Sequence, residues 1–63
     1  MNRALIEFRK SIDKTTEQMA RKIGVSESYY LKIEYGQRNP SYNFISKFKR
    51  AFPKADIGIF FRK

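Results

Sequence analysis

Hydrophobic residues recur at intervals of three and four along most of the chain, the spacing that places them on one face of an α-helix. Leu5, Phe8 and Ile12 follow this spacing and are separated by charged residues, which predicts an amphipathic helix over about residues 2–11. A later set predicts the buried face of a helix that Pro53 closes; it consists of Tyr42, Ile45, Phe48 and Phe52. The chain is therefore expected to be built from helices that share one core.

Two shorter helices meet at a glycine in the middle of the chain. Residues 15–18 (TTEQ) fit a capping box, which predicts that a helix begins there and continues over about residues 16–23. Gly24 ends this helix, because glycine adopts the left-handed conformation of a sharp turn without steric cost. Ser26 is a favourable N-cap for a further helix over about residues 27–35. Two helices joined by such a turn are typical of a helix-turn-helix unit.

The fold class predicted from these elements is all-α, a compact four- to five-helix domain. Strand signals are nearly absent, and residues 56–61 are expected to form a short fifth helix although Gly58 weakens that prediction. We find no linker, repeat or low-complexity segment, so residues 1–63 are interpreted as a single domain. A chain of this length forms one modest core.

The helix expected over residues 27–35 has two different faces. At about 100° per residue, Tyr30 and Ile33 lie on one side and are expected to face the core. A mostly polar set lies on the other side; it consists of Glu27, Ser28, Leu31, Lys32 and Tyr35. The crossing of this helix over its predecessor needs a small residue, which Ala20 provides.

Four of the outward residues suit the edges of base pairs in a DNA major groove. Lys32 can donate to guanine, and Glu27 can accept from the amino group of cytosine. Ser28 can donate or accept, and Leu31 can pack on a thymine methyl group. An ordinary solvated helix face of mixed character is the alternative for all four.

The formal net charge of +8 on 63 residues favours a polyanionic partner, either nucleic acid or an anionic membrane surface. A solvated basic surface without a partner is the alternative. The absence of cysteine and histidine excludes disulfides and the usual zinc sites. The sequence also lacks a glycine-rich phosphate loop, so we expect no enzyme, no cofactor, no metal and no small-molecule ligand.

Phosphate contacts are expected from the loop after the third predicted helix and from neighbouring cap positions, with Arg38 as the leading candidate. The full set consists of Thr16, Tyr29, Tyr35, Gln37, Arg38 and Asn39. Further cations occur in the fourth predicted helix at Lys47, Lys49 and Arg50. These three either add long-range attraction to DNA or form an ordinary solvated face.

The chain resembles the Cro and phage-repressor type (XRE-like) of helix-turn-helix regulators from about Leu5 to Phe61. Four segments carry the resemblance: residues 15–20 (TTEQMA), 24–26 (GVS), 33–36 (IEYG) and 38–41 (RNPS). It implies a lambda-repressor-like domain with a supporting helix at about 16–23 and a recognition helix at about 27–35. It also implies a prokaryotic or phage-borne (mobile-element) transcriptional regulator, most often a repressor, that binds double-stranded DNA.

The resemblance further implies roles for single residues. Glu27, Ser28 and Lys32 match base-contacting positions of the family's recognition helix. Arg9 and Glu34 match a structural salt bridge that ties the first helix to the end of the third. Because the family's last helix often forms a two-fold interface, a homodimer on a palindromic operator is expected, with contacts from Ile57, Ile59, Phe60 and Phe61.

Two positions depart from the family pattern. Thr16 stands where the family usually has a glutamine that touches phosphate, so its reach is shorter. Tyr30 occupies a core position that is more often aliphatic, and it can stay buried if its hydroxyl finds a hydrogen-bond partner.

The predicted function is that of a sequence-specific transcriptional regulator that inserts the helix over residues 27–35 in the major groove. The alternative is a protein-interaction module or antitoxin-like partner-binding protein in which DNA binding is secondary; RNA binding by charge alone is a third. No apolar run approaches the ~20 residues that span a bilayer, and a secretory signal is not evident. We therefore expect no membrane partner and a cytoplasmic, nucleoid-associated protein.

Overall fold

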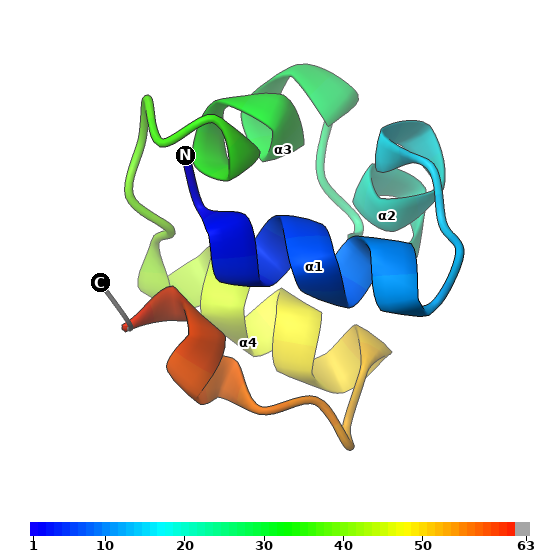
Figure 1. The fold of residues 1–63 in the computed structure, drawn as a ribbon. Coiled ribbons are helices and arrows are strands. Elements are labelled where there is room, and N and C mark those ends of the chain that lie inside the picture. Colours follow the sequence, from blue (N-terminus) through cyan, green and yellow to red (C-terminus); the bar gives the residue numbers. More distant parts are fainter. Residues whose placement is uncertain (62–63) are drawn as a thin grey trace.

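Four α-helices and one short 3-10 helix make up the computed structural model, which describes residues 1–61 (Figure 1). In chain order they are α1 (Arg3–Ser11), α2 (Thr16–Ile23), α3 (Glu27–Glu34), α4 (Tyr42–Ala51) and η1 (Ile57–Phe60). Residues 62–63, the end of the predicted domain, lie outside the described residues. No strand occurs within residues 1–61, which confirms the all-α fold class.

Each α-helix begins at a polar side chain that accepts a backbone N–H of its first turn. The four caps are Asn2, Thr15, Ser26 and Ser41. The predicted capping box is confirmed: Thr15 Oγ1 accepts the Gln18 N–H at 3.1 Å, and Gln18 Oε1 accepts the Thr15 N–H at 3.0 Å. A cap of this kind stabilises a helix by about 0.5–2 kcal/mol. The caps therefore determine where the helices start.

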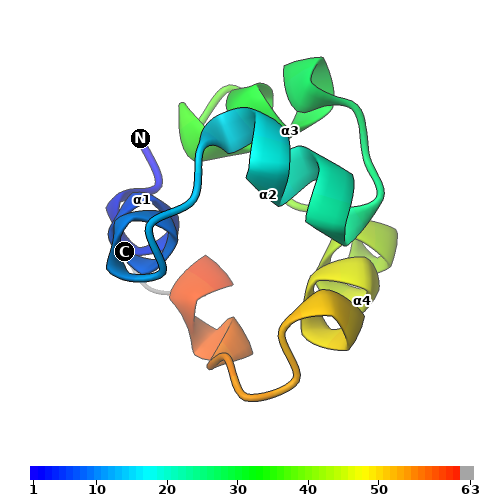
Figure 2. The same ribbon diagram turned by 90° about the vertical axis from the view of Figure 1, so that its right-hand side faces the viewer.

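Gly24 makes the turn between α2 and α3, as predicted. Its φ of +95° lies in the left-handed region, which residues with a Cβ rarely adopt. The N–H groups of Gly24 and Val25 both donate to Ala20 O, at 2.8 and 3.0 Å, and close the end of α2. The chain enters α3 directly after this turn, and α2 and α3 pack side by side (Figure 2).

The core lies between all five elements and is rich in aromatic rings. Its largest fully buried side chains are Tyr30, Phe44, Phe48, Leu5, Met19 and Ile33. The Phe8 ring of α1 meets Phe48 edge-to-face with 5.4 Å between centroids. The Phe60 ring of η1 meets Phe44 and Phe48 in the same way, at 5.6 and 4.9 Å. Each such pair adds about 0.5–1.5 kcal/mol beyond area burial. These rings hold η1 on α4, and η1 also contacts α1, so it lies between the two helices (Figure 2).

The buried face of α4 differs from the predicted one. Tyr42 was expected in the core, but its side chain is 83 % exposed at the first position of the helix. Phe44, which was not predicted, is buried instead. Phe48 is buried as predicted, while Ile45 and Phe52 are half-buried against the core. A buried Phe44 needs no hydrogen-bond partner, whereas a buried Tyr42 would need one for its hydroxyl. The helix is therefore rotated relative to the prediction.

The apolar residues near the C-terminus are less available to a partner than expected. Ile59 is only 8 % exposed and belongs to the core, so its assignment to a dimer interface is wrong. Ile57 and Phe60 are half-buried and pack against the same core. Phe61 alone among these four is exposed, at 69 %. The core thus accommodates three of these four side chains, at least in part.

Candidate nucleic-acid interface

Helix α3 buries one face and exposes the other. Tyr30 and Ile33 are buried in the core, on the side that the sequence analysis assigned to them. Glu27, Ser28 and Lys32 are exposed on the opposite side. These three side chains form a short polar surface that nothing in residues 1–61 covers, and we call it the reading face. Leu31, the fourth predicted base contact, is half-buried and offers less of its surface to DNA.

Helix α2 supports α3 from behind. Ala20, the small residue expected at the crossing, is buried there together with Met19 and Ile23. Val25 is half-buried and packs on the same core from the turn. These apolar contacts hold the two helices in one arrangement, so the direction of the reading face is fixed by the core.

A buried carboxylate ties α1 to the end of α3. Glu34 is 3 % exposed, and Arg9 donates to both of its oxygens, from Nε to Oε2 at 3.0 Å and from Nη2 to Oε1 at 3.3 Å. The hydroxyl of Tyr30 donates to the same Oε2 at 2.7 Å. Arg9 Nη1 also donates to Lys14 O at 3.1 Å, which brings in the loop between α1 and α2. We call Arg9, Tyr30 and Glu34 the Glu34 network.

The electrostatics of the Glu34 network favour a scaffold. The hydrogen bond with Glu34 raises the pKa of the Arg9 guanidinium above its usual value. Burial raises the pKa of the Tyr30 hydroxyl, and its hydrogen bond to Glu34 acts in the same direction. Both groups therefore keep their protons at neutral pH. Removal of one partner of such a buried pair leaves an uncompensated group, which is strongly destabilising.

The first residues of α2 and α3 are joined by a side-chain hydrogen bond. Thr16 Oγ1 donates to Glu27 Oε2 at 2.8 Å. From the sequence, Thr16 was predicted to contact phosphate and Glu27 to contact a base, and no contact between the two was predicted. A threonine hydroxyl carries one proton, so while this bond is made the hydroxyl does not donate to a phosphate. The Thr16 backbone N–H, in the first turn of α2, remains the donor suited to an anion.

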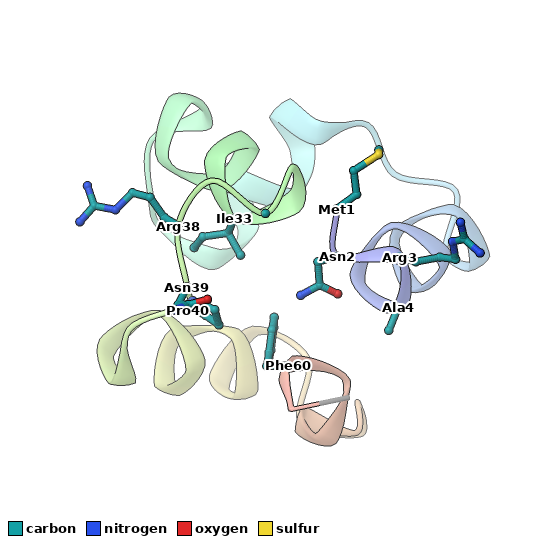
Figure 3. Close-up of a pocket in the computed structure, with 10 residues that line it drawn as sticks. Met1, Asn2, Arg3, Ala4, Ile33, Arg38, Asn39, Pro40 and Phe60 are labelled. Carbon is teal, nitrogen blue, oxygen red and sulfur yellow. The ribbon is translucent and has the colours of Figure 1, made fainter. Parts of the chain in front are cut away.

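A second polar cluster lies where α3 meets the following loop. The guanidinium of Arg38 stands over the Tyr29 ring, 5.7 Å from its centroid. The Tyr29 hydroxyl donates to Ser41 Oγ at 3.2 Å, which links α3 to the cap of α4. The backbone N–H groups of Gln37 and Arg38 both donate to Lys32 O, at 2.8 and 3.2 Å. The loop is therefore fastened to the helix, and the Arg38 side chain extends outward from it (Figure 3).

The same edge contains the remaining predicted phosphate contacts and one residue that the sequence analysis missed. Tyr35, Gln37 and Asn39 are exposed there. Tyr42 directly follows Ser41 and is more exposed than Tyr35, so it joins them as a candidate contact. Its place right after a serine N-cap, in the first turn of a helix, was the signal that could have identified it.

A hollow of about 300 Å³ separates the start of α1 from the loop after α3 (Figure 3). The Asn2 N–H donates to Glu34 O at 2.8 Å and holds the N-terminal segment against the end of α3. The Phe60 ring points into the hollow, whereas Arg38 points away from it (Figure 3). None of the residues that line the hollow belongs to the reading face.

Neither a metal site nor a membrane span is found in residues 1–61. Within that range no group of three or more histidine, cysteine, aspartate or glutamate side chains could hold a metal ion. None of its helices is long and apolar enough to cross a bilayer.

The comparison with protein families agrees with this geometry. A helix-turn-helix family model matches residues 5–55, which contain most of α1 and the whole of α2, α3 and α4. Neither the curated proteins nor the solved structures gave a match to this chain. The family model covers most of the chain and agrees with the observed all-helical fold, so the chain belongs to the Cro/XRE type of the helix-turn-helix DNA-binding family.

Proposed function

We propose that the protein is a sequence-specific transcriptional regulator that places α3 in the major groove of double-stranded DNA and represses by excluding polymerase from an overlapping promoter. The observation that carries this proposal is the reading face. Glu27, Ser28 and Lys32 are exposed on a helix whose opposite side is buried in the core. Each of the three can form hydrogen bonds with base edges that differ among the four base pairs in the major groove.

The phosphate-facing edge beside α3 supports the same proposal. Arg38, Gln37 and Asn39 extend from a loop fastened to Lys32 O, next to exposed Tyr35 and Tyr42. Cationic and polar groups at the border of a recognition helix set the register of a protein on the duplex, while base contacts set the sequence preference. The arrangement separates these two tasks between two neighbouring surfaces.

The dimensions of the domain favour a dimer on DNA. Helix α3 has eight residues and is about 12 Å long, enough for three to four base pairs. The domain measures 24 × 24 × 22 Å, whereas successive major grooves on one side of a duplex are about 34–36 Å apart. One domain therefore covers one half-site, and a two-fold pair would read a palindromic operator. Among the four apolar residues expected at the contact between copies, Phe61 is the exposed one and is our candidate for that contact.

Selection of bound duplexes from a random DNA pool, followed by a salt titration of the selected site, tests the proposal. We expect a palindrome with half-sites one helical turn apart, because each copy presents one reading face. Affinity for that site should fall with salt according to the number of phosphate contacts. A pool that stays random, while affinity falls steeply with salt, would show a non-specific polycation and refute sequence-specific regulation.

A further inference from the structure

The hydrogen bond between Thr16 and Glu27 places a carboxylate at the DNA-facing end of α3. From this contact we infer that Thr16 is a positioning residue that aims Glu27 at a base amino group, so that the start of α3 selects cytosine. The inference rests on the proposed function, because it assigns a base preference to one position of the reading face.

The Thr16 side chain is well placed to orient its partner. Its backbone directly follows Thr15, whose capping box with Gln18 fixes the first turn of α2. Thr16 is half-buried and its side chain is β-branched, which restricts rotation about χ1. Glu27 is exposed and would otherwise have to give up rotamer freedom on binding a base. A donor held on α2 thus orders the carboxylate before DNA arrives.

The negative charge of Glu27 is not compensated inside the protein. Glu27 shares a shallow hollow of about 220 Å³ between α2 and α3 with Arg21. Arg21 pairs with Glu17 instead, at 3.6 Å. Within residues 1–61 the Thr16 bond to Oε2 is the one hydrogen bond of the Glu27 carboxylate, and no ion pair involves it. Oε1 therefore needs a donor from the DNA if the charge is to be tolerated near phosphates.

The four bases differ in whether they can donate a hydrogen bond to the Glu27 carboxylate. An ionised carboxylate accepts hydrogen bonds and donates none. In the major groove cytosine presents the N4 amino group, whereas guanine presents two acceptors and thymine an acceptor beside a methyl group. Adenine presents a donor next to the N7 acceptor, which repels a carboxylate. The expected order at this position is cytosine first, adenine second, and guanine and thymine last.

Binding of four duplexes by fluorescence anisotropy tests the inference. The duplexes derive from the selected operator and carry the four base pairs in turn at one half-site position, and the series is repeated at each position of the half-site to locate the one that prefers cytosine. Wild type should prefer cytosine over guanine or thymine by roughly 5- to 150-fold. Thr16→Val should reduce this preference by about 3- to 10-fold, whereas Thr16→Ser, which keeps the hydroxyl, should retain it. Glu27→Gln should move the preference towards adenine, because an amide pairs with both N6 and N7.

Glu17→Gln is the matched control for charge. It removes the same negative charge from the first turn of α2, where Glu17 is exposed and pairs only with Arg21 among the described residues. It should strengthen binding to all four duplexes by a similar factor and leave their order unchanged. Glu27→Gln, in contrast to this control, should change the order in which the four bases are preferred.

Three results would overturn the inference. The first is a Thr16→Val protein that binds all four duplexes more weakly by the same factor, since Thr16 would then only support the packing of α2 on α3. The second is an unchanged base order in Glu27→Gln. The third comes from the free protein: three-bond couplings of the Thr16 methyl should report one χ1 rotamer in wild type and an average in Glu27→Ala, and averaging in wild type would exclude the hydrogen bond.

The failure of the inference is distinguishable from that of the proposed function. A selected palindrome whose base order ignores Glu27 refutes the inference alone. A pool that stays random refutes sequence-specific regulation, and the base selection falls with it even if Thr16 keeps a single rotamer.

Discussion

Replacement of Tyr30 by phenylalanine removes one hydroxyl group from the centre of the domain and is expected to lower its stability substantially. Tyr30 is fully buried, and its hydroxyl donates to Glu34 Oε2 at 2.7 Å. A hydrogen bond to a charged group contributes about 1.5–3 kcal/mol. Phenylalanine retains the ring and its tilted contact with Phe44, so the loss should come from the hydroxyl alone. We expect the free energy of unfolding to fall by about 1.5–3 kcal/mol.

This loss is large compared with the total stability of so small a domain. At roughly 0.05–0.15 kcal/mol per residue, 63 residues give about 3–9 kcal/mol in all. A change of 1 kcal/mol shifts the Tm of a domain of this size by about 4–8 °C. Tyr30→Phe should therefore lower the Tm by about 6–24 °C, an effect well outside experimental error.

Thermal and urea unfolding followed by far-ultraviolet circular dichroism measure the effect. Tyr29→Phe is the matched control, because its hydroxyl bond to Ser41 Oγ is exposed and longer, at 3.2 Å. We expect the control to lose less than about 1 kcal/mol. Equal losses in the two variants, or no loss in Tyr30→Phe, would refute the argument that the Glu34 network depends on the buried hydroxyl.

The difference in stability between wild type and Tyr30→Phe is expected to depend on pH. Burial raises the pKa of Tyr30 in the folded state above the value of 10.0 for a free tyrosine. Above pH 10 the unfolded chain releases this proton while the folded protein keeps it, so the stability due to the buried neutral hydroxyl is present below pH 10 and declines above it. The difference between wild type and Tyr30→Phe should shrink by about 1.4 kcal/mol by pH 11. A difference that is constant from pH 8 to 11 would contradict the raised pKa.

Three further substitutions have distinct expected outcomes. Lys32→Ala should relax the preference at one or two operator positions at a cost of about 1–3 kcal/mol, whereas Lys22→Ala, an equal loss of charge on an exposed residue of α2, should leave the preference unchanged. Arg38→Ala should weaken binding to all duplexes alike and reduce the salt slope by about one, as measured by anisotropy titrations; a change in base preference would contradict its assignment to phosphate. Gly24→Ala should cost about 1–2 kcal/mol in urea unfolding, because φ is +95° although a Cβ there meets no atom within 4 Å. An unchanged unfolding midpoint would show that the turn relaxes.

The local chemistry of the chain was enough to predict most helix boundaries. Thr15, Ser26 and Ser41 act on their immediate neighbours, so their caps follow from short segments of sequence. Gly24 likewise ends α2 through its own backbone conformation. Because boundaries of this kind depend on residues close in sequence, they can be predicted without a structure.

The orientation of α4 and the burial of the C-terminal segment could not be predicted from local sequence in the same way. Tyr42 and Phe44 both fit a helical repeat, and the choice between them depends on what other elements present to α4. Phe60 resolves it by packing on Phe44 from η1, a contact between distant parts of the chain. Ile59 is buried for the same reason. Periodicity within one helix does not contain that information.

The candidate site was predicted as a set of residues but not as a set of contacts. The exposed side of α3 followed from helical geometry, because Tyr30 and Ile33 identify the buried side. The bond from Thr16 to Glu27 connects residues eleven positions apart on two helices, and it depends on the crossing of α2 and α3. From the sequence alone both residues could be named as site residues, but it could not be predicted that they lie within hydrogen-bond distance of each other.

The backbone of Lys32 couples the position of the reading face to the position of the loop after α3. Its side chain lies on the reading face, while its backbone oxygen accepts the N–H groups of Gln37 and Arg38. Lys32 thus belongs to the proposed reading face through its side chain and holds the loop of the proposed phosphate contacts through its backbone oxygen. Fraying of the last turn of α3 would misalign the two together, so partial engagement is disfavoured and the domain should bind its half-site as one rigid body.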